Sequence, residues 1–111
     1  MKGLIIKEPY IDLILIGKKV WEIRGSNTSI RGRIALIKSG SKKIFGEVDL
    51  VDSFEINLAK YNEHCIKLYG KKEEKLPYKK TYAWVVRNPI LYDKPKNYVH
   101  PKGAVIWVNL D

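Results

Sequence analysis

The sequence predicts a small α+β domain, in which about six short strands form a curled sheet or barrel with two short helices at its ends. Short runs of branched apolar residues recur along the 111 residues, separated by turns rich in glycine, serine, asparagine and proline. Only two segments show the three- and four-residue apolar spacing of a helix. The density of strands and turns does not fit parallel βαβ units, which need longer connections.

Length and composition indicate one globular domain spanning residues 1–111. Hydrophobic residues make up 45% of the chain and charged residues 30%, which excludes a disordered chain. The longest apolar run, Leu13 to Ile16, is too short to cross a bilayer. The first residues lack the apolar region of a signal peptide, so we expect a cytoplasmic location. Cys65 is the only cysteine, which excludes an internal disulfide.

The first third of the chain predicts a strand, a helix and a second strand. Lys2–Lys7 is a branched apolar run, and Pro9 is suited to the first turn of a helix. Gly17 ends that helix, and a short strand follows at Lys19–Arg24. The apolar face of the helix is predicted to consist of Tyr10, Leu13, Ile14 and Ile16.

Two further strands are predicted before the longer helix. Gly25–Ser29 is a turn by composition, and Ile34–Ile37 reads as a buried strand. After a turn at residues 38–41, a longer strand covers Lys43–Phe54. Its alternation of apolar and polar residues slips near Val51 and Asp52, which predicts a bend or bulge there.

The longer helix is predicted over Asn57–Tyr69, with Asn57 as its N-cap and Gly70 as its C-terminal stop. Its apolar stripe is Leu58, Tyr61, Cys65, Leu68 and Tyr69. Cys65 is expected to be buried and inert on that stripe. The following Lys71–Lys80 stretch is predicted to be a flexible loop.

The last third predicts strands at Thr81–Val86 and Pro89–Tyr92, broken or bent at residues 87–89. A turn is predicted at Asp93–Asn97 and a tight element at His100–Gly103. Ala104–Leu110 closes the chain as a strand.

The strand around Lys19–Arg24 has an unusual distribution of side chains. By alternation, Glu22 and Arg24 share one face, and Lys19 and Trp21 share the other, so that neither face is cleanly apolar. A cation, an acid and a flat ring within one short strand suit a planar polar ligand such as a nucleobase. The alternatives are an exposed Glu22–Arg24 ion pair, worth at most about 1 kcal/mol, and a tryptophan that belongs to the core.

The formal net charge of +9 makes a polyanionic partner plausible, because binding phosphates releases condensed counterions. Much of the excess lies in Lys71–Lys75 and Lys79–Lys80, a pattern that a solvated loop would also show. The charge alone therefore indicates no particular groove.

Several separated motifs resemble the ASCH domain family, whose members share the β-barrel of the PUA-like superfold. The first motif is Gly17, Lys19 and Arg24, in and just before the predicted Lys19–Arg24 strand. The others are Arg31–Leu36, Ser39–Gly40, Tyr82–Trp84, Asn88–Pro89 and His100–Trp107. The resemblance spans nearly the whole chain and is to the tryptophan-containing branch. It implies the fold, and a pocket between the barrel and the first helix, walled by the Lys19–Arg24 strand. In RNA-binding relatives such a cleft holds nucleic acid.

One branch of small bacterial members resembles an amidohydrolase that removes the acetyl group from N4-acetylcytidine. That branch uses a lysine, a threonine three residues later and a glutamate from the following helix. Lys19 matches the lysine, but Glu22 stands at the threonine position and Leu68 near the glutamate position, with Glu63 a few residues away. A carboxylate cannot replace a hydroxyl nucleophile without a change of chemistry.

Two functions follow as hypotheses. The first is a module that binds RNA or a modified nucleoside, in which Lys19 and Arg24 meet oxygens, Glu22 accepts from an exocyclic amine, and Trp21 or Trp84 stacks on a base. Its candidate binding residues are Lys19, Trp21, Glu22, Arg24, Ser39, Tyr82, Trp84, His100 and Lys102. The second is an amidohydrolase acting on an N-acylated nucleoside, with Lys19 as base and Glu22 or Glu63 handling protons.

The remaining expectations concern partners. His64 and His100 do not show a metal-ligand spacing with the scattered acids, so no metal and no cofactor is expected. His100 could transfer protons, but a turn in which its imidazole caps backbone groups is the favoured interpretation. No membrane contact is expected, and a monomer or weak dimer fits the chain. An adaptor that recognises a protein tail remains a third possibility without a positive sign in the sequence.

Overall fold

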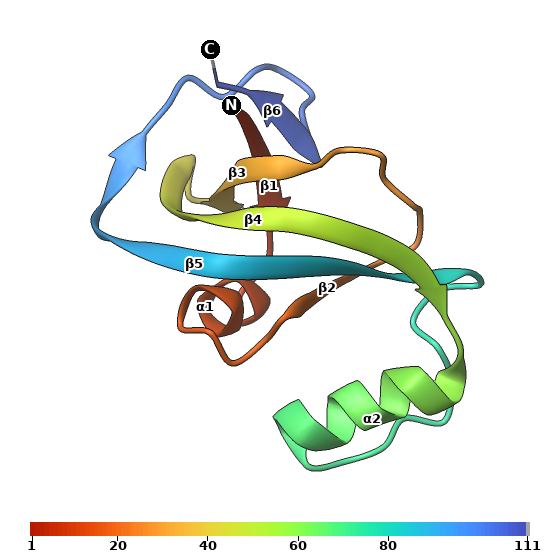
Figure 1. Cartoon of the computed structure of the whole chain (residues 1–111). Helices are drawn as coiled ribbons and strands as arrows, with labels where there is room; N and C mark the ends of the chain where they lie inside the picture. Colours follow the sequence, from red (N-terminus) through yellow and green to blue (C-terminus); the bar gives the residue numbers. More distant parts are fainter. Residues whose placement is uncertain (111) are drawn as a thin grey trace.

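The chain folds into one curled, mixed sheet with two helices, as seen in a computed structural model that describes residues 1–110 (Figure 1). The α+β class, the number of strands and the two helices are confirmed. The elements are β1 (Lys2–Ile6), α1 (Tyr10–Leu15), β2 (Trp21–Arg24), β3 (Gly32–Lys38), β4 (Lys43–Ile56), α2 (Leu58–Tyr69), β5 (Thr81–Asn97) and β6 (Trp107–Asn109). Within residues 1–110, neither helix is long and apolar enough to cross a membrane.

The six strands lie in the order β2-β5-β4-β3-β1-β6, and every neighbouring pair is antiparallel except β1 with β3. The two edge strands, β2 and β6, do not pair with each other in the described part of the chain, so the sheet is open and not a closed barrel. It nevertheless curls far enough that Arg24 on β2 donates through Nη2 to the carbonyl oxygen of Ile5 on β1, at 2.8 Å. A side chain therefore bridges the gap that a backbone ladder would close.

The main core lies between the concave side of the sheet and α1, which Figure 1 shows directly against the strands. Its buried members are Leu4, Ile6, Ile11, Ile14, Leu15, Ile34, Leu36, Val48, Leu50, Trp84 and Val86. Trp84 is 2% exposed, stacks on Trp107 at 5.9 Å between ring centroids, and donates through Nε1 to the carbonyl oxygen of Ser26. The expectation that Trp107 packs in the core holds, because its ring lies against the main cluster.

Helix α1 differs from its predicted apolar face. Its buried residues are Ile11, Ile14 and Leu15, whereas Ile16 is 56% and Tyr10 is 42% exposed. The reason is that the helix ends at Leu15, so Ile16 already lies in the turn that Gly17 completes at a φ of 84°.

The long strands agree with the sequence at one bulge and differ from it at the C-terminal end. Pairing of β4 with β5 shifts register between Leu50 and Asp52, which confirms the predicted irregularity. The predicted break at residues 87–89 is a bend within one continuous strand, where Asn88 takes a φ of 53°. The predicted turn at Asp93–Asn97 is wrong, because cross-strand pairing of Lys96 and Asn97 with the start of β4 extends the strand through it. The predicted last strand is shorter, with only Trp107–Asn109 paired.

Helix α2 has the predicted ends. Asn57 accepts a hydrogen bond at 2.9 Å from the backbone N–H of Lys60, and Gly70 ends the helix in the left-handed conformation. Of its predicted apolar stripe only Cys65 is buried. Figure 1 shows the reason, because α2 stands apart from the sheet at the far end of β4 and does not lie over the core.

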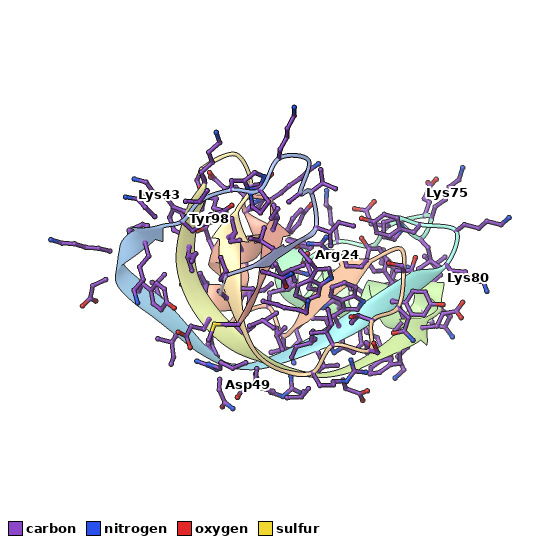
Figure 2. The ribbon with its side chains drawn as sticks, turned by 90° about the horizontal axis from the view of Figure 1, so that it is seen from above. Arg24, Lys43, Asp49, Lys75, Lys80 and Tyr98 are labelled. Carbon is purple, nitrogen blue, oxygen red and sulfur yellow. The ribbon has the colours of Figure 1, made fainter. Side chains whose placement is uncertain are left out.

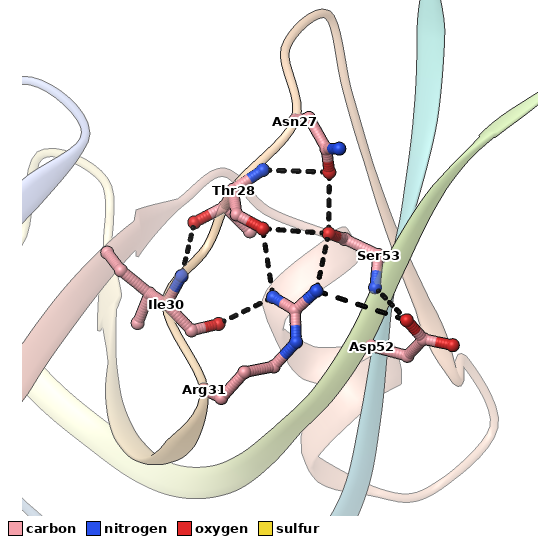
Figure 3. Close-up of polar contacts among 6 residues, drawn as sticks. All are labelled: Asn27, Thr28, Ile30, Arg31, Asp52 and Ser53. Carbon is pink, nitrogen blue, oxygen red and sulfur yellow. Dashed lines mark hydrogen bonds and ion pairs between the residues drawn. The ribbon is translucent and has the colours of Figure 1, made fainter.

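The loop after β2 is tied to β4 by a network of polar contacts around Arg31 and Ser53 (Figure 3). Arg31 Nη1 donates to the carbonyl oxygens of Thr28 and Ile30, and Arg31 Nη2 donates to Ser53 Oγ at 3.0 Å. Ser53 Oγ in turn donates to Asn27 Oδ1 at 2.6 Å. This network holds the loop that carries Ser26, the hydrogen-bond acceptor of Trp84, and so fixes the end of β2.

Gly46 lies on β4 at a point where there is no room for a side chain. A Cβ at this position would overlap the carbonyl oxygen of Ile90 and Cδ2 of Leu15. We predict that Gly46→Ala lowers the free energy of unfolding by about 3 kcal/mol, because backbone atoms must move to admit the methyl group. Urea denaturation measures this change.

The matched control is Gly40→Ala in the turn between β3 and β4. Nothing lies within 4 Å of a Cβ there, but φ is 83°, so only backbone strain of about 1 kcal/mol is expected. Equal losses for the two variants would contradict a steric role for Gly46.

Candidate functional site

The position of Lys19 is set by the end of helix α1. The backbone N–H groups of Lys18 and Lys19 both donate to the carbonyl oxygen of Leu13, each at 3.0 Å, after Gly17 has turned the chain. Lys19 therefore precedes β2, which begins at Trp21, and strand alternation does not govern its direction. Its side chain is turned inward, and the residue is only 3% exposed.

Glu22 and Arg24 lie on β2 and form a tight pair. Arg24 donates to Glu22 Oε2 from Nε at 2.9 Å, and Nη2 lies 2.8 Å from the same oxygen. Arg24 Nη2 also reaches the carbonyl of Ile5, and the guanidinium lies 5.6 Å from the ring of Trp84. Glu22 is 5% exposed, yet no described residue donates to its other oxygen, Oε1. Glu22 is thus held rigidly by one oxygen and keeps the other free.

Lys19, Glu22 and Arg24 line the same cavity, which has a volume of about 620 Å³. The prediction that Lys19 faces the opposite side from Glu22 is therefore wrong. The physical reason is that alternation applies only within the paired strand, which starts after Lys19.

The walls of this cavity come from both halves of the chain. Ile5 and the start of α1 form one side, β2 forms the floor, and α2 with the following loop forms the other side. The lining residues are Ile5, Lys7, Pro9, Tyr10, Lys19, Glu22, Ile23, Arg24, Ser39, Tyr61, His64, Cys65, Tyr69, Lys71, Glu73, Pro77, Tyr78 and Val105. The cleft expected beside the first helix thus has α2 as its second wall.

His64 connects α2 to the floor of the cavity. Its Nε2 lies 3.3 Å from Lys19 Nζ, and its ring stacks on Trp21 with centroids 5.4 Å apart and planes 17° apart. Burial, and then the charge of Lys19, lower the pKa of His64 to about 4. The imidazole is therefore neutral at pH 7, and Nε2 accepts from the Lys19 ammonium, which can only donate.

Lys19 is a buried cation with few partners. Burial lowers its pKa below the usual 10.5, while the nearby Glu22 carboxylate opposes that effect. His64 is its hydrogen-bond partner among the described residues, and the ring of Tyr10 lies 5.6 Å from Nζ. Two of the three ammonium hydrogens therefore have no hydrogen-bond acceptor among the described residues.

Of the other predicted site residues, only Ser39 lines this cavity. Trp21 and Glu63 lie beside a second depression of about 400 Å³, and Glu63 is exposed and paired with Lys60 at 3.4 Å. Trp84 is in the core, where Trp107 and Arg24 lie against its ring. Tyr82 packs against the same core cluster.

The C-terminal candidates, His100 and Lys102, are not among the residues that line the cavity. His100 Nδ1 is 2.7 Å from the Tyr98 hydroxyl, and His100 Nε2 is 3.0 Å from the carbonyl oxygen of Ala104. The imidazole of His100 thus hydrogen-bonds a backbone group of its own turn, in agreement with the interpretation that the sequence favoured. Lys102 is exposed on that turn.

Sequence reasoning missed most of the aromatic wall. Tyr61, Cys65 and Tyr69 occur at four-residue spacing on α2, which the helix periodicity assigned to a core stripe. That face instead borders the cavity, together with His64, Tyr10 and Tyr78. The sequence feature that could have indicated this cavity wall is the occurrence of tyrosine, and not leucine or isoleucine, on this face of the helix, since tyrosine presents a polar hydroxyl.

The described residues contain no group of three or more His, Cys, Asp or Glu side chains that could hold a metal ion. The polar groups at the cavity floor are instead one ammonium, one carboxylate and one guanidinium. The site is therefore defined by charge and hydrogen bonding within an aromatic wall.

The fold and site define a small curled-sheet domain with a charged cavity at the gap between its first two strands. The chain belongs to the ASCH domain family, whose model matches residues 4–96. This confirms the family resemblance seen in the sequence.

Similar solved structures are ASCH proteins from Zymomonas mobilis. The crystal structure of that protein has a TM-score of 0.65 and 16% identity, covering 86% of this chain and 72% of the other. Its serine-to-alanine mutant has a TM-score of 0.65 and 16% identity, covering 97% and 87%. Its tyrosine-to-phenylalanine mutant has a TM-score of 0.60 and 17% identity, covering 86% and 74%. At these identities the likeness shows the fold alone. Among curated proteins, none matches the chain.

The burial of Lys19 predicts a measurable cost to stability. We predict that Lys19→Met raises the free energy of unfolding by about 1–3 kcal/mol at pH 7, because an apolar side chain of similar length replaces a desolvated cation while Glu22 keeps Arg24. Because the folded pKa of Lys19 is lowered, the unfolded chain binds the proton more tightly. Wild-type stability should therefore rise with pH toward 10.5, and the advantage of the variant should shrink.

Lys18→Met is the matched control, since Lys18 is exposed. It should change the free energy of unfolding by less than about 0.5 kcal/mol, both at pH 7 and at higher pH. A Lys19→Met protein less stable than wild type would show that the ammonium supports the fold and is not retained at a cost.

Proposed function

We propose that this protein binds RNA or a modified nucleoside by taking a nucleobase into the cavity floored by Lys19, Glu22 and Arg24. One observation carries the proposal: Lys19 and Glu22, 3% and 5% exposed, face one cavity and each keeps hydrogen-bonding capacity that the protein does not use. Buried polar groups normally find partners within the protein, so spare capacity at such depth favours a ligand that completes it.

The chemistry of the floor suits the edge of a base. Lys19 donates to a ring carbonyl or nitrogen, and Glu22 Oε1 accepts from an exocyclic amine or a ring N–H. Arg24 orients the carboxylate through its two contacts to Oε2 and does not need to meet the ligand. The cavity volume of about 620 Å³ falls within the usual range for small-ligand sites.

The aromatic wall supplies the faces on which a base stacks. Tyr10, Tyr69 and Tyr78 line the cavity and remain 40–46% exposed, so their rings are accessible to a ligand. Stacking on such side chains contributes roughly 1–3 kcal/mol per base. Trp21 and Trp84, the stacking residues expected from the sequence, lie behind this wall and in the core.

The basic loop after α2 adds attraction for phosphates. Lys71 lines the cavity, and the other lysines of residues 71–80 are exposed on the same loop. In Figure 2, Lys75 and Lys80 lie at one end of the molecule and Arg24 lies near its middle. The loop lysines therefore serve long-range attraction, while the cavity floor supplies the selective contacts.

Isothermal titration with the four ribonucleosides, N4-acetylcytidine and short RNA oligomers tests this function. We predict that Glu22→Gln and Lys19→Met each weaken binding of the preferred ligand at least tenfold, because each removes a hydrogen bond that involves a charged group.

Lys18→Ala is the matched control and should retain wild-type affinity, because Lys18 is exposed and does not line the cavity. Binding that survives both floor substitutions, in proteins with wild-type circular dichroism, would place the nucleic-acid surface elsewhere. No binding of any probe by wild type would contradict the proposal outright.

The second candidate is an amidohydrolase acting on an N-acylated nucleoside. It is favoured by the lowered pKa of Lys19, which makes this amine a better base near neutral pH. No threonine stands beside Lys19, so a water molecule must attack the acyl carbon. Glu22 Oε1 is the carboxylate oxygen placed to orient that water, whereas Glu63 lies outside the cavity.

Chromatographic detection of cytidine released from N4-acetylcytidine tests hydrolysis. If the protein is a hydrolase, we predict that Lys19→Met and Glu22→Gln each lower kcat/KM at least 100-fold, since each removes a proton-transfer or orienting group. Lys18→Ala should keep the wild-type rate. Tight binding without cytidine release would reject the hydrolase and leave the binding module.

A further inference from the structure

We propose that Lys19 is a nucleophilic amine that forms an imine with an aldehyde or ketone admitted to the cavity, the carbonyl compound carrying an anionic group. This goes beyond nucleobase recognition, because it assigns covalent reactivity to the lysine.

The location of Lys19 meets the first requirement of an imine-forming amine. Such a lysine must be shielded from bulk water yet accessible to a small molecule. Lys19 is 3% exposed and lines a cavity of about 620 Å³, whereas the neighbouring Lys18 is exposed and lies outside it. The cavity excludes most water from Nζ and still leaves room for a ligand.

The surroundings of Nζ meet the second requirement, a free electron pair on nitrogen. Burial favours the neutral amine, and His64, itself neutral at pH 7, can accept a hydrogen bond from an amine N–H, which leaves the nitrogen electron pair free. The other groups that act on Nζ are Glu22, which favours the ammonium, Cys65, which acts in the same direction when ionised, and Arg24, which disfavours it. Burial is the largest of these effects, so the lysine is more reactive than a surface lysine.

The reaction is balanced without a further reagent. The Nζ electron pair forms a bond to the carbonyl carbon, and the π electrons of the C=O bond move to oxygen. The resulting carbinolamine loses water, which carries the former carbonyl oxygen and both amine hydrogens, and a C=N bond remains. The proton that the ammonium releases beforehand goes to solvent.

The anionic part of the ligand is indicated by the cations on the cavity wall. Lys7 is exposed, lines the cavity and makes no ion pair with a described residue, and Lys71 lies on the opposite wall beside Glu73. Arg24 is already occupied by Glu22 and Ile5. A phosphate or carboxylate group is therefore expected to meet Lys7 while the carbonyl carbon reaches Lys19.

Borohydride trapping tests the proposal with two probes, glyoxylate and the larger pyridoxal 5′-phosphate. After reduction, peptide mass spectrometry compares labelling at Lys19 with labelling at Lys18 in the same protein. We predict at least tenfold greater labelling of Lys19 at pH 7 with at least one probe. Labelling by glyoxylate alone would also support the imine and would set a size limit. Labelling of Lys19 at or below the level of Lys18 with both probes would overturn the proposal.

Glu22→Gln separates this reactivity from nucleobase binding. Loss of the carboxylate removes the main charge that stabilises the Lys19 ammonium, so imine trapping should become at least threefold faster while nucleoside affinity falls. Slower trapping in a folded Glu22→Gln protein would contradict the assigned role of the free amine. Trapping at Lys19 in a wild-type protein that binds no nucleoside would reject the proposed function and leave the imine proposal standing.

Discussion

The contact between Arg24 and the carbonyl oxygen of Ile5 is the constraint on which the site depends. Arg24 belongs to β2 and Ile5 to β1, and three strands, β5, β4 and β3, separate β2 from β1 in the sheet. Curling of the sheet nevertheless brings Arg24 Nη2 within 2.8 Å of the Ile5 carbonyl oxygen. Backbone pairing does not close the sheet there. The guanidinium spans the gap and at the same time holds Glu22 in place. The opening that remains between the two strands is where the cavity forms.

The charged floor is a costly arrangement that the rest of the fold makes possible. Burying an ammonium and a carboxylate opposes folding unless each is compensated. Glu22 is compensated by Arg24, which itself lies against the ring of Trp84 in the core. Among the described residues, Lys19 has the neutral imidazole of His64, the ring of Tyr10 and the more distant charge of Glu22. This asymmetry marks Lys19 as the residue whose placement is least explained by stability.

The sequence predicted the fold well because its signals are local. Branched runs, the Asn57 cap, the glycine stops and the slip near Val51 each reflect a preference within a few residues of chain. The sequence also indicated the Lys19–Arg24 segment as a candidate site, since a lysine, an acid and an arginine interrupt an apolar pattern. The direction of the Lys19 side chain could not be predicted, because it depends on the residue at which the turn after α1 ends and β2 begins.

The wall formed by α2 was beyond sequence reasoning for a different reason. Periodicity shows that Tyr61, Cys65 and Tyr69 share a face of the helix but does not show what that face meets. The extended end of β4 carries α2 away from the sheet, so the face borders a cavity and not the core. Only the three-dimensional path of β4 contains that information.

The stacked pair of Trp21 and His64 forms a partition between the main cavity and the smaller depression on its other side. A molecule that displaces the imidazole from one side would also remove its stacking contact with the indole that borders the other. The two hollows share this wall, and any change in affinity that filling one produces at the other must be matched, by thermodynamic reciprocity, by a change of the same factor at the first when the second is filled.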